Sequence, residues 1–150
     1  QDGSIKKGAQ MLNAVSNSNV PHLTVIIGNS YGAGTYAMSG REFGNSFTFL
    51  WPTAKIAVMG GEVIAGVMSI VRRGQAARKG IKFDEKTDAE IVKNQQIGHD
   101  KASVALKATS VLSDDGIIDP RDTRNILGMC LSIVNNKEVK GSEGFGVFRL

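Results

Sequence analysis

The sequence predicts an α/β fold, and three observations support this class. Residues 22–28, HLTVIIG, form a short and almost wholly apolar run rich in β-branched side chains, which is typical of a strand covered on both faces. Two further runs of this kind occupy residues 46–51 and 54–60. Segments with helical spacing lie before, between and after these strands, and this alternation favours an α/β domain. The 150 residues contain neither an internal repeat nor a linker, so we expect a single domain.

The first expected elements follow one another closely. Ser4 is the expected N-cap of a helix over residues 5–17, in which apolar residues recur at helical spacing. The strand at 22–28 comes next, followed by a glycine-rich loop. Residues 35–40 predict a short helix that Gly40 closes.

The middle of the chain predicts strands and then longer helices. The strands at 46–51 and 54–60 lead into a helix over residues 62–73. Residues 83–110 are polar and mixed in charge, and they predict one long helix or two short ones. Gly98 weakens the middle of this stretch as a helix.

The C-terminal part predicts one more strand and one more helix. Residues 114–119 predict a turn and a short strand. Asp119 as N-cap and Pro120 at the first helical position open a final helix that reaches about Asn135. The tail, residues 141–150, is interrupted by glycines and ends in aromatic and aliphatic residues that could dock on a partner surface.

Composition is that of an ordinary globular domain, with 41% hydrophobic and 21% charged residues. No apolar run approaches the length of a membrane-spanning helix, and no signal peptide is visible at the start, so we expect no membrane association. The chain opens on Gln1 rather than methionine, and we therefore expect a piece of a longer protein.

The net charge of +4 comes from scattered basic residues, apart from the group Arg72, Arg73, Arg78 and Lys79. A solvated helix end, with Arg72 and Arg73 in the last helical turn, is the simpler interpretation of this group. A patch for an anionic partner, such as a phosphate-bearing cofactor, is the alternative.

Cys130 is the only cysteine, which excludes an internal disulfide and a cysteine-based zinc site. It lies in the apolar run 126–134, where we expect a buried and unreactive thiol. A lone cysteine fits a reducing compartment. We expect the chain to bind no metal.

The loop after the first strand contains the pattern G-x-S-x-G, which is typical of the nucleophile elbow of serine hydrolases. Ser30 is then the nucleophile, and an acid and a histidine must follow it in the chain. The only later histidine, His99, falls in a polar helical stretch, and His22 precedes the serine. The sequence gives this interpretation little support.

Two other interpretations of the loop rely on backbone N–H groups. Gly32 and Gly34 after a strand resemble part of a dinucleotide fingerprint, but Tyr36 and Ala37 break the pattern and no P-loop lysine follows. Successive small residues at a strand-to-helix turn also let several amides converge on one oxygen, as an oxyanion hole does. A tight turn packed against neighbouring backbone explains the glycines equally well.

Four stretches of the chain occur in the order found in one enzyme family. They are residues 20–41 (VPHLTVIIGNSYGAGTYAMSGR), 51–62 (WPTAKIAVMGGE), 114–124 (DDGIIDPRDTR) and 145–150 (FGVFRL). With these stretches the chain resembles, over nearly its whole length, the carboxyltransferase (β) subunit of biotin-dependent acyl-CoA carboxylases. Within this family the stretches resemble the methylcrotonoyl-CoA carboxylase β subunit more than they resemble the propionyl-CoA and acetyl-CoA enzymes.

The resemblance implies a crotonase-like ββα superhelix, with residues 1–150 as most of the C-terminal carboxyltransferase domain of a longer subunit. It implies carboxyl transfer from carboxybiotin to the α or γ carbon of an acyl-CoA, with biotin carried in trans on a carrier domain. The implied partners are a biotin carrier or biotin carboxylase subunit and further copies of the β subunit, with the active site at their interface and no nucleic acid. The implied location is the cytoplasm of a bacterium or the mitochondrial matrix of a eukaryote.

The resemblance also assigns the catalytic groups of the glycine-rich loop. In this family two adjacent backbone N–H groups of the loop form an oxyanion hole for the ureido oxygen of biotin. The matching residues here are Ala33 and Gly34. On this interpretation Ser30 has no catalytic role, and the glycines allow the backbone to approach the ligand closely.

Further site residues follow from the same match. Tyr31, Gly32 and Tyr36 are expected to bind biotin, and Tyr36 is a candidate for substrate selectivity or else a packed aromatic residue. Gly60 and Gly61, at a helix start, are expected to flank the acyl-CoA, or they simply allow the helix to begin.

The chain departs from the family pattern in three places. His22 stands where relatives often carry lysine, residues 1–9 match the family well only in Gly8, Ala9 and the spacing, and residues 94–109 are dissimilar from the family. The departure at residues 94–109 leaves the acyl chain open between methylcrotonyl-CoA and a branched or longer acyl-CoA. The alternatives in function are a biotin-dependent decarboxylase subunit of the glutaconyl-CoA type and a non-catalytic assembly domain.

Overall fold

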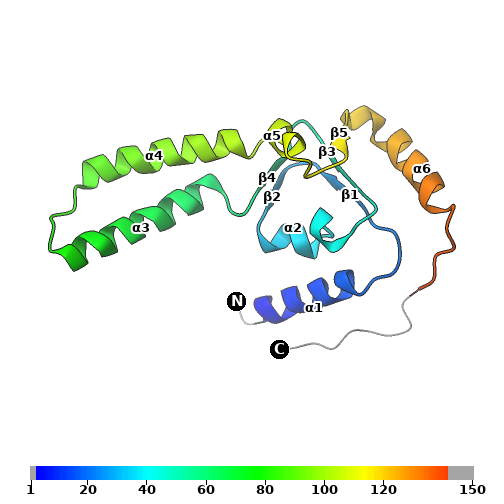
Figure 1. Ribbon diagram of the computed structural model, residues 1–150, viewed down its shortest axis with the longest axis horizontal. Coiled ribbons are helices and arrows are strands. Elements are labelled where there is room, and N and C mark those ends of the chain that lie inside the picture. Colours follow the sequence, from blue (N-terminus) through cyan, green and yellow to red (C-terminus); the bar gives the residue numbers. More distant parts are fainter. Residues whose placement is uncertain (1–2, 142–150) are drawn as a thin grey trace.

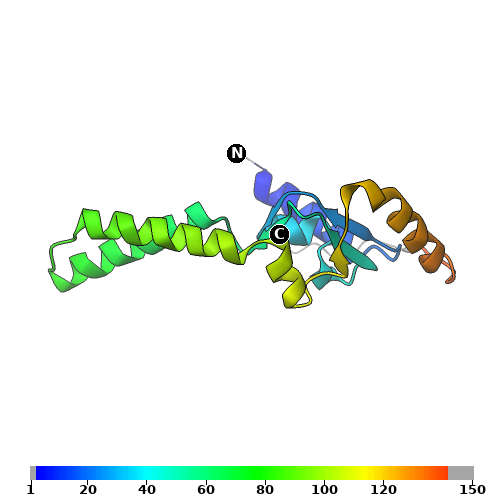
Figure 2. The same cartoon turned by 90° about the horizontal axis from the view of Figure 1, so that it is seen from above.

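The computed structural model of the chain describes residues 3–141. Short parallel strands and short helices form a central body, and a pair of long helices projects from one side of it (Figures 1 and 2). The predicted α/β class is therefore confirmed. Within residues 3–141, no helix is both long and apolar enough to cross a lipid bilayer.

The first sheet has three parallel strands in the order β1-β3-β5. These strands are β1 (Leu23–Ile26), β3 (Phe47–Leu50) and β5 (Gly116–Ile117). Val25 of β1 lies opposite Phe49 of β3. Parallel strands whose side chains are largely apolar are covered on both faces, which is why these segments read as continuous apolar runs in the sequence.

The second sheet pairs β2 (Asn29–Tyr31) with β4 (Lys55–Ala57), again in parallel. β1 continues into β2, and β3 continues into β4, each through a short turn. The chain thus passes twice from the first sheet to the second by the same route. The glycine-rich loop therefore lies at the end of β2, in the second sheet.

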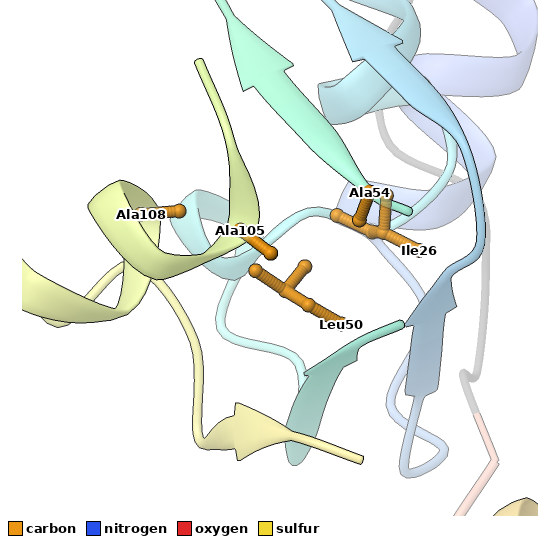
Figure 3. Close-up of a cluster of buried hydrophobic side chains, with 5 residues drawn as sticks. All are labelled: Ile26, Leu50, Ala54, Ala105 and Ala108. Carbon is orange, nitrogen blue, oxygen red and sulfur yellow. The ribbon is translucent and has the colours of Figure 1, made fainter. Parts of the chain in front are cut away.

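A first apolar cluster lies where the chain passes between the sheets. It contains Ile26, Leu50, Ala54 and, from the short helix α5 (Ala105–Ser110), Ala105 and Ala108. Leu50 has no exposed surface, and its side chain points toward Ala105 in Figure 3. Burying such a side chain contributes about 2 kcal/mol to folding.

A second cluster fixes α6 (Thr123–Val134) to the first sheet. Phe49, Ile118 and Cys130 are its buried members, and the indole N–H of Trp51 donates to the Thr123 hydroxyl at 3.0 Å. Cys130 is only 3% exposed, and burial raises the pKa of its thiol. The expectation of a buried thiol is confirmed.

The α3–α4 hairpin consists of α3 (Gly61–Lys79) and α4 (Glu85–Ala102), which lie side by side and project from the body (Figure 1). Asp88 of α4 is 6% exposed and accepts hydrogen bonds from the Ser69 hydroxyl and from Nε of Arg72, the latter at 2.6 Å. This buried ion pair joins the first turn of α4 to the middle of α3.

The predicted strands at 22–28, 46–51 and 54–60 are confirmed as β1, β3 and β4, each shorter than expected because the chain turns toward the other sheet. The strand β2 was not predicted. Its sequence, Asn-Ser-Tyr, lacks an apolar run, and it forms because it pairs with β4.

Two helix starts differ from the prediction. The helix α1 (Ser4–Ser16) begins at Ser4, so Gly3 and not Ser4 occupies the cap position. The helix predicted at 35–40 is α2 (Ala33–Ala37), which begins two residues earlier.

The helices of the hairpin also differ in length from the prediction. The helix predicted at 62–73 continues to Lys79, so Arg72 and Arg73 are not in its last turn. The stretch 83–110 forms two helices. They are separated at Ser103, whose carbonyl accepts the N–H of Ile56 at 2.8 Å.

Asp119 is a cap, as predicted, but it caps the short turn that precedes the last helix, and Asp122 is at the N-cap of the helix itself. The carboxylate of Asp119 accepts the backbone N–H of Arg121 at 2.9 Å. The residues that follow first form a 3₁₀ turn, Pro120–Asp122, and then α6. The expected docking tail falls mainly on residues 142–150, outside the described residues.

We predict that Asp88→Asn loosens the α3–α4 hairpin without unfolding the sheets. The Ser69 hydroxyl, and then the Arg72 guanidinium, lower the pKa of Asp88 against the opposing effect of desolvation. A carboxyl with a lowered folded-state pKa stabilises the fold above its unfolded pKa of about 4, and this contribution is lost as the pH falls through the folded value. Hydrogen-exchange protection of α3 and α4 should therefore fall in Asp88→Asn at neutral pH, and in the unmodified chain only below about pH 4.

The matched control is Glu90→Gln, which removes the same charge from an exposed position on α4. Protection in β1 and β3 should stay unchanged in both variants. Equal loss of protection in Asp88→Asn and Glu90→Gln would contradict the role of the buried ion pair.

Candidate functional site

The junction between β2 and α2 is built around Gly32. Its φ is +59° and its ψ is −138°, and its N–H donates to the carbonyl of Ala57 at 3.1 Å. A Cβ at this position would lie 2.8 Å from the carbonyl oxygen of Val58. Both the positive φ and the close approach require glycine.

The next two amides are the ones predicted to form an oxyanion hole. Ala33 and Gly34 are the first two residues of α2, and both are exposed. Neither of their N–H groups donates to any acceptor in residues 3–141, whereas the N–H of Thr35 bonds to the carbonyl of Gly32 at 3.1 Å. Two adjacent free N–H groups at a helix start can hold one oxygen that carries negative charge.

The space beside these amides is open. A Cβ built on Gly34 meets no atom of the described chain within 4 Å. Gly34 is therefore not required for internal packing, unlike Gly32. Free donors next to open space are the arrangement that a bound oxygen needs.

A pocket of about 170 Å³ lies along α2. Its lining includes Gly32, Thr35 and Tyr36 from the loop and α2, Glu42 from the 3₁₀ turn Arg41–Phe43, and residues 56–58 at β4. Glu42 was not singled out from the sequence. It is the one carboxylate among residues 26–50, which is the signal that could have indicated it.

Tyr36 is both a packing partner and a partly exposed side chain. It packs edge-on against Phe43, with ring centroids 5.9 Å apart, and it is still 40% exposed. One part of the ring is thus a packing partner, and the rest faces the pocket that Gly32 also lines.

Of the two glycines at the start of α3, only Gly61 is required by packing. A Cβ on Gly60 would lie 3.6 Å from the ring of Tyr31, which is an ordinary contact distance. A Cβ on Gly61 would lie 2.8 Å from Oδ1 of Asp100 and 3.1 Å from the carbonyl of Gln96. Gly61 is buried against α4. Tyr31 and Gly60 lie close together, and neither of them lines the pocket that contains Tyr36.

Ser30 does not pair with a histidine. Its hydroxyl shares a hydrogen bond with the Thr35 hydroxyl at 2.8 Å. The ring of His22 contacts Ser39 and Ser18, and His99 lies on α4. The serine–histidine pair of a hydrolase is therefore missing among residues 3–141.

The four basic residues of α3 have two different environments. Arg72 is paired with Asp88, and Arg73 is paired with Glu85 while its guanidinium lies 4.8 Å from the centre of the Phe83 ring. These two arginines are occupied in holding the hairpin together. Arg78 and Lys79, in the last turn of α3, are exposed.

Comparison with known proteins gives consistent relatives. The chain is 50% identical over 150 residues to the probable biotin-dependent acyl-coenzyme A carboxylase beta2 subunit of Mycobacterium tuberculosis, covering all of this chain and 28% of that protein. It is 42% identical over 149 residues to the mitochondrial methylcrotonoyl-CoA carboxylase beta chain of Arabidopsis thaliana, covering 99% of this chain and 25% of that one. The chain thus spans about a quarter of the length of these relatives.

Solved structures agree with this relationship. The beta subunit of geranyl-CoA carboxylase from P. aeruginosa matches with a TM-score of 0.81 and 41% identity, over 99% of this chain and 28% of that one. Transcarboxylase 12S, described as a hexamer assembly, matches with a TM-score of 0.76 and 29% identity, over 99% of this chain and 27% of that one. The fold is that of carboxyltransferases, which is crotonase-like, as the resemblance implied.

The family model for the carboxyl transferase domain matches residues 1–146, almost the whole chain. Two relatives from Mycobacterium tuberculosis are named as subunits of biotin-dependent carboxylases. Together with two free amides at a glycine-dependent strand-to-helix junction, this match assigns the chain to the carboxyl transferase domain family.

Proposed function

We propose that residues 1–150 form most of the C-terminal domain of a carboxyltransferase subunit, and that the N–H groups of Ala33 and Gly34 bind the ureido oxygen of biotin. The observation that carries this proposal is the pair of adjacent amides with no acceptor in residues 3–141. In a buried or occupied site, each well-aimed donor of this kind stabilises a developing oxyanion by about 3 kcal/mol.

When bound, carboxybiotin supplies the carboxyl group and a carbonyl oxygen that becomes electron-rich as that group departs. The two N–H groups donate to this oxygen without any proton transfer from a side chain. Because Gly32 is fixed by Ala57 and Val58, the donors are oriented before the ligand arrives. Little reorganisation is then needed in the transition state.

The remaining residues of the loop would shape the biotin site. Tyr36 and Gly32 line the pocket along α2, which supports contact with the bicyclic ring. Tyr31 supports the site from β2, through its packing against Gly60. For Gly60 and Gly61 we propose that the start of α3 flanks the acyl-CoA, although Gly61 itself is occupied by packing on α4.

We propose that the substrate is an acyl-CoA with a branched or extended acyl chain and that biotin arrives on a separate carrier. The names methylcrotonoyl-CoA carboxylase and geranyl-CoA carboxylase among the relatives support this class of substrate. The relatives include bacterial proteins and mitochondrial ones, in keeping with a cytoplasmic or a matrix location that depends on the source.

We propose further that a neighbouring subunit completes the active site. Exposed apolar side chains recur along α3 at Val63, Val67 and Ile70, which is typical of a helix face that another structure covers. The hexamer assembly described for transcarboxylase 12S supports an oligomer.

The first test compares Gly34→Val with Ser30→Ala in the complete carboxylase. A side chain at position 34 enters open space, so it should block the ligand without disturbing the fold, and we expect kcat for carboxyl transfer to fall at least ~100-fold. Ser30→Ala loses only the contact with Thr35, and most activity should remain. The assay is carboxylation of acyl-CoA with free or carrier-bound biotin.

Gly128→Val is the matched control, because a Cβ on Gly128 also meets no atom of the described chain within 4 Å but lies on α6. It should leave transfer intact. The backbone oxyanion hole would be contradicted if Gly34→Val and Ser30→Ala lowered kcat equally, or if Gly34→Val did not lower kcat at all.

A second test concerns Tyr36. Tyr36→Ala should open the pocket along α2 and change the ratio of kcat/KM values between short and long acyl-CoA substrates by about tenfold, the scale expected for contacts of a few methylene groups. Tyr36→Phe keeps the edge-on contact with Phe43 and should keep the ratio. An unchanged ratio in both variants would mean that Tyr36 only packs.

A further inference from the structure

A residue just beyond α2 has an unusual backbone conformation. Ser39 lies two residues past the helix with a φ of +61°, and it is only 8% exposed. A residue with a Cβ seldom adopts this left-handed conformation, and it stays there only where its surroundings hold it.

Three side chains hold Ser39 in this conformation. The Thr24 hydroxyl donates to the carbonyl of Ser39 at 2.7 Å, and the amide of Asn45 donates to the same oxygen at 3.1 Å. Nδ1 of His22 forms a hydrogen bond with the Ser39 hydroxyl at 2.7 Å, while Nε2 contacts the Ser18 hydroxyl at 3.0 Å. We call Ser39 with His22, Thr24 and Asn45 the Ser39 clamp.

The Ser39 clamp connects α2 to the first sheet. Thr24 lies in β1, and the side-chain nitrogen of Asn45 also lies within hydrogen-bond distance of β3, 3.2 Å from the carbonyl oxygen of Phe47 and 2.6 Å from the Thr48 hydroxyl. The other end of α2 is fixed to the second sheet, because Gly32 donates to Ala57.

A helix of five residues has almost no stability of its own, so its orientation depends on how its two ends are held. Only the end at Gly32 carries the free amides. The opposite end sets the tilt of the helix, and a displacement of about 1 Å in a catalytic group can cost ~100-fold in rate.

We infer that the Ser39 clamp is a positioning device for carboxyl transfer: by fixing the C-terminal end of α2, it directs the N–H groups of Ala33 and Gly34 at their oxygen. This inference rests on the proposed function of those amides. The clamp residues do not touch the ligand, and they act through α2.

The experiment compares Thr24→Val with Thr24→Ser in the complete carboxylase. Valine has the shape of threonine but removes the donor to Ser39, whereas serine keeps it. In Thr24→Val we expect α2 amides to exchange faster and kcat to fall about tenfold, with KM for acyl-CoA unchanged, because the oxyanion donors act in the transition state. Thr24→Ser should restore both quantities.

Thr123→Val is the matched control, since it removes a hydroxyl of similar burial that accepts from Trp51 at the start of α6. It should leave α2 exchange and kcat unchanged. Ser39→Gly is a second variant if Thr24→Val does not fold. Glycine adopts the positive φ freely, but it lacks the hydroxyl that contacts His22, so kcat should again fall.

The outcomes separate the inference from the function on which it rests. Unchanged α2 exchange in Thr24→Val and Ser39→Gly overturns the clamp. Faster exchange with normal kcat, while Gly34→Val abolishes transfer, overturns the positioning role alone. If Thr24→Val speeds exchange but neither Thr24→Val nor Gly34→Val lowers kcat, the proposed function is overturned, and the positioning role is overturned with it.

Discussion

The close approach of Gly32 to the backbone of β4 is the constraint on which the site depends. Its N–H is bonded to Ala57, and the carbonyl of Val58 occupies the place where a side chain would begin. The backbone therefore turns sharply from β2 into α2 at this residue, with a positive φ that glycine alone adopts at low cost. As a result, the N–H groups of Ala33 and Gly34 come at the start of a helix, where they have no acceptor within residues 3–141.

The two sheets fix this junction from both sides. β1 and β3 form a buried parallel pair, and each continues into a strand of the second sheet, so the position of β2 follows from the packing of Ile26 and Leu50 in the first cluster. The short helix α2 then connects the second sheet, at Gly32, with the first sheet, at Ser39. A helix held at both ends is a rigid support for backbone donors, and rigid donors are what oxyanion stabilisation requires.

Much of this could be predicted from the sequence, and the exceptions have physical causes. The apolar runs of β1 and β3 and the cap at Asp119 are local signals, and the structure confirms them. β2 and the break at Ser103 were not predictable, since both depend on hydrogen bonds to β4, a segment distant in sequence. The same applies to Ser39, because nothing in a serine reveals a positive φ that residues 22, 24 and 45 stabilise. The oxyanion role of Ala33 and Gly34 is proposed from the resemblance to the family, and the two amides without an acceptor in residues 3–141 support that proposal.

The central claim is that two backbone amides and no side chain receive the oxygen of biotin. A crystal structure of the complete carboxyltransferase with biotin bound tests it most directly. The account predicts the ureido oxygen at about 3 Å from the nitrogens of both Ala33 and Gly34. An oxygen held by a side chain instead, or amides bonded to another part of the protein in that structure, would contradict it.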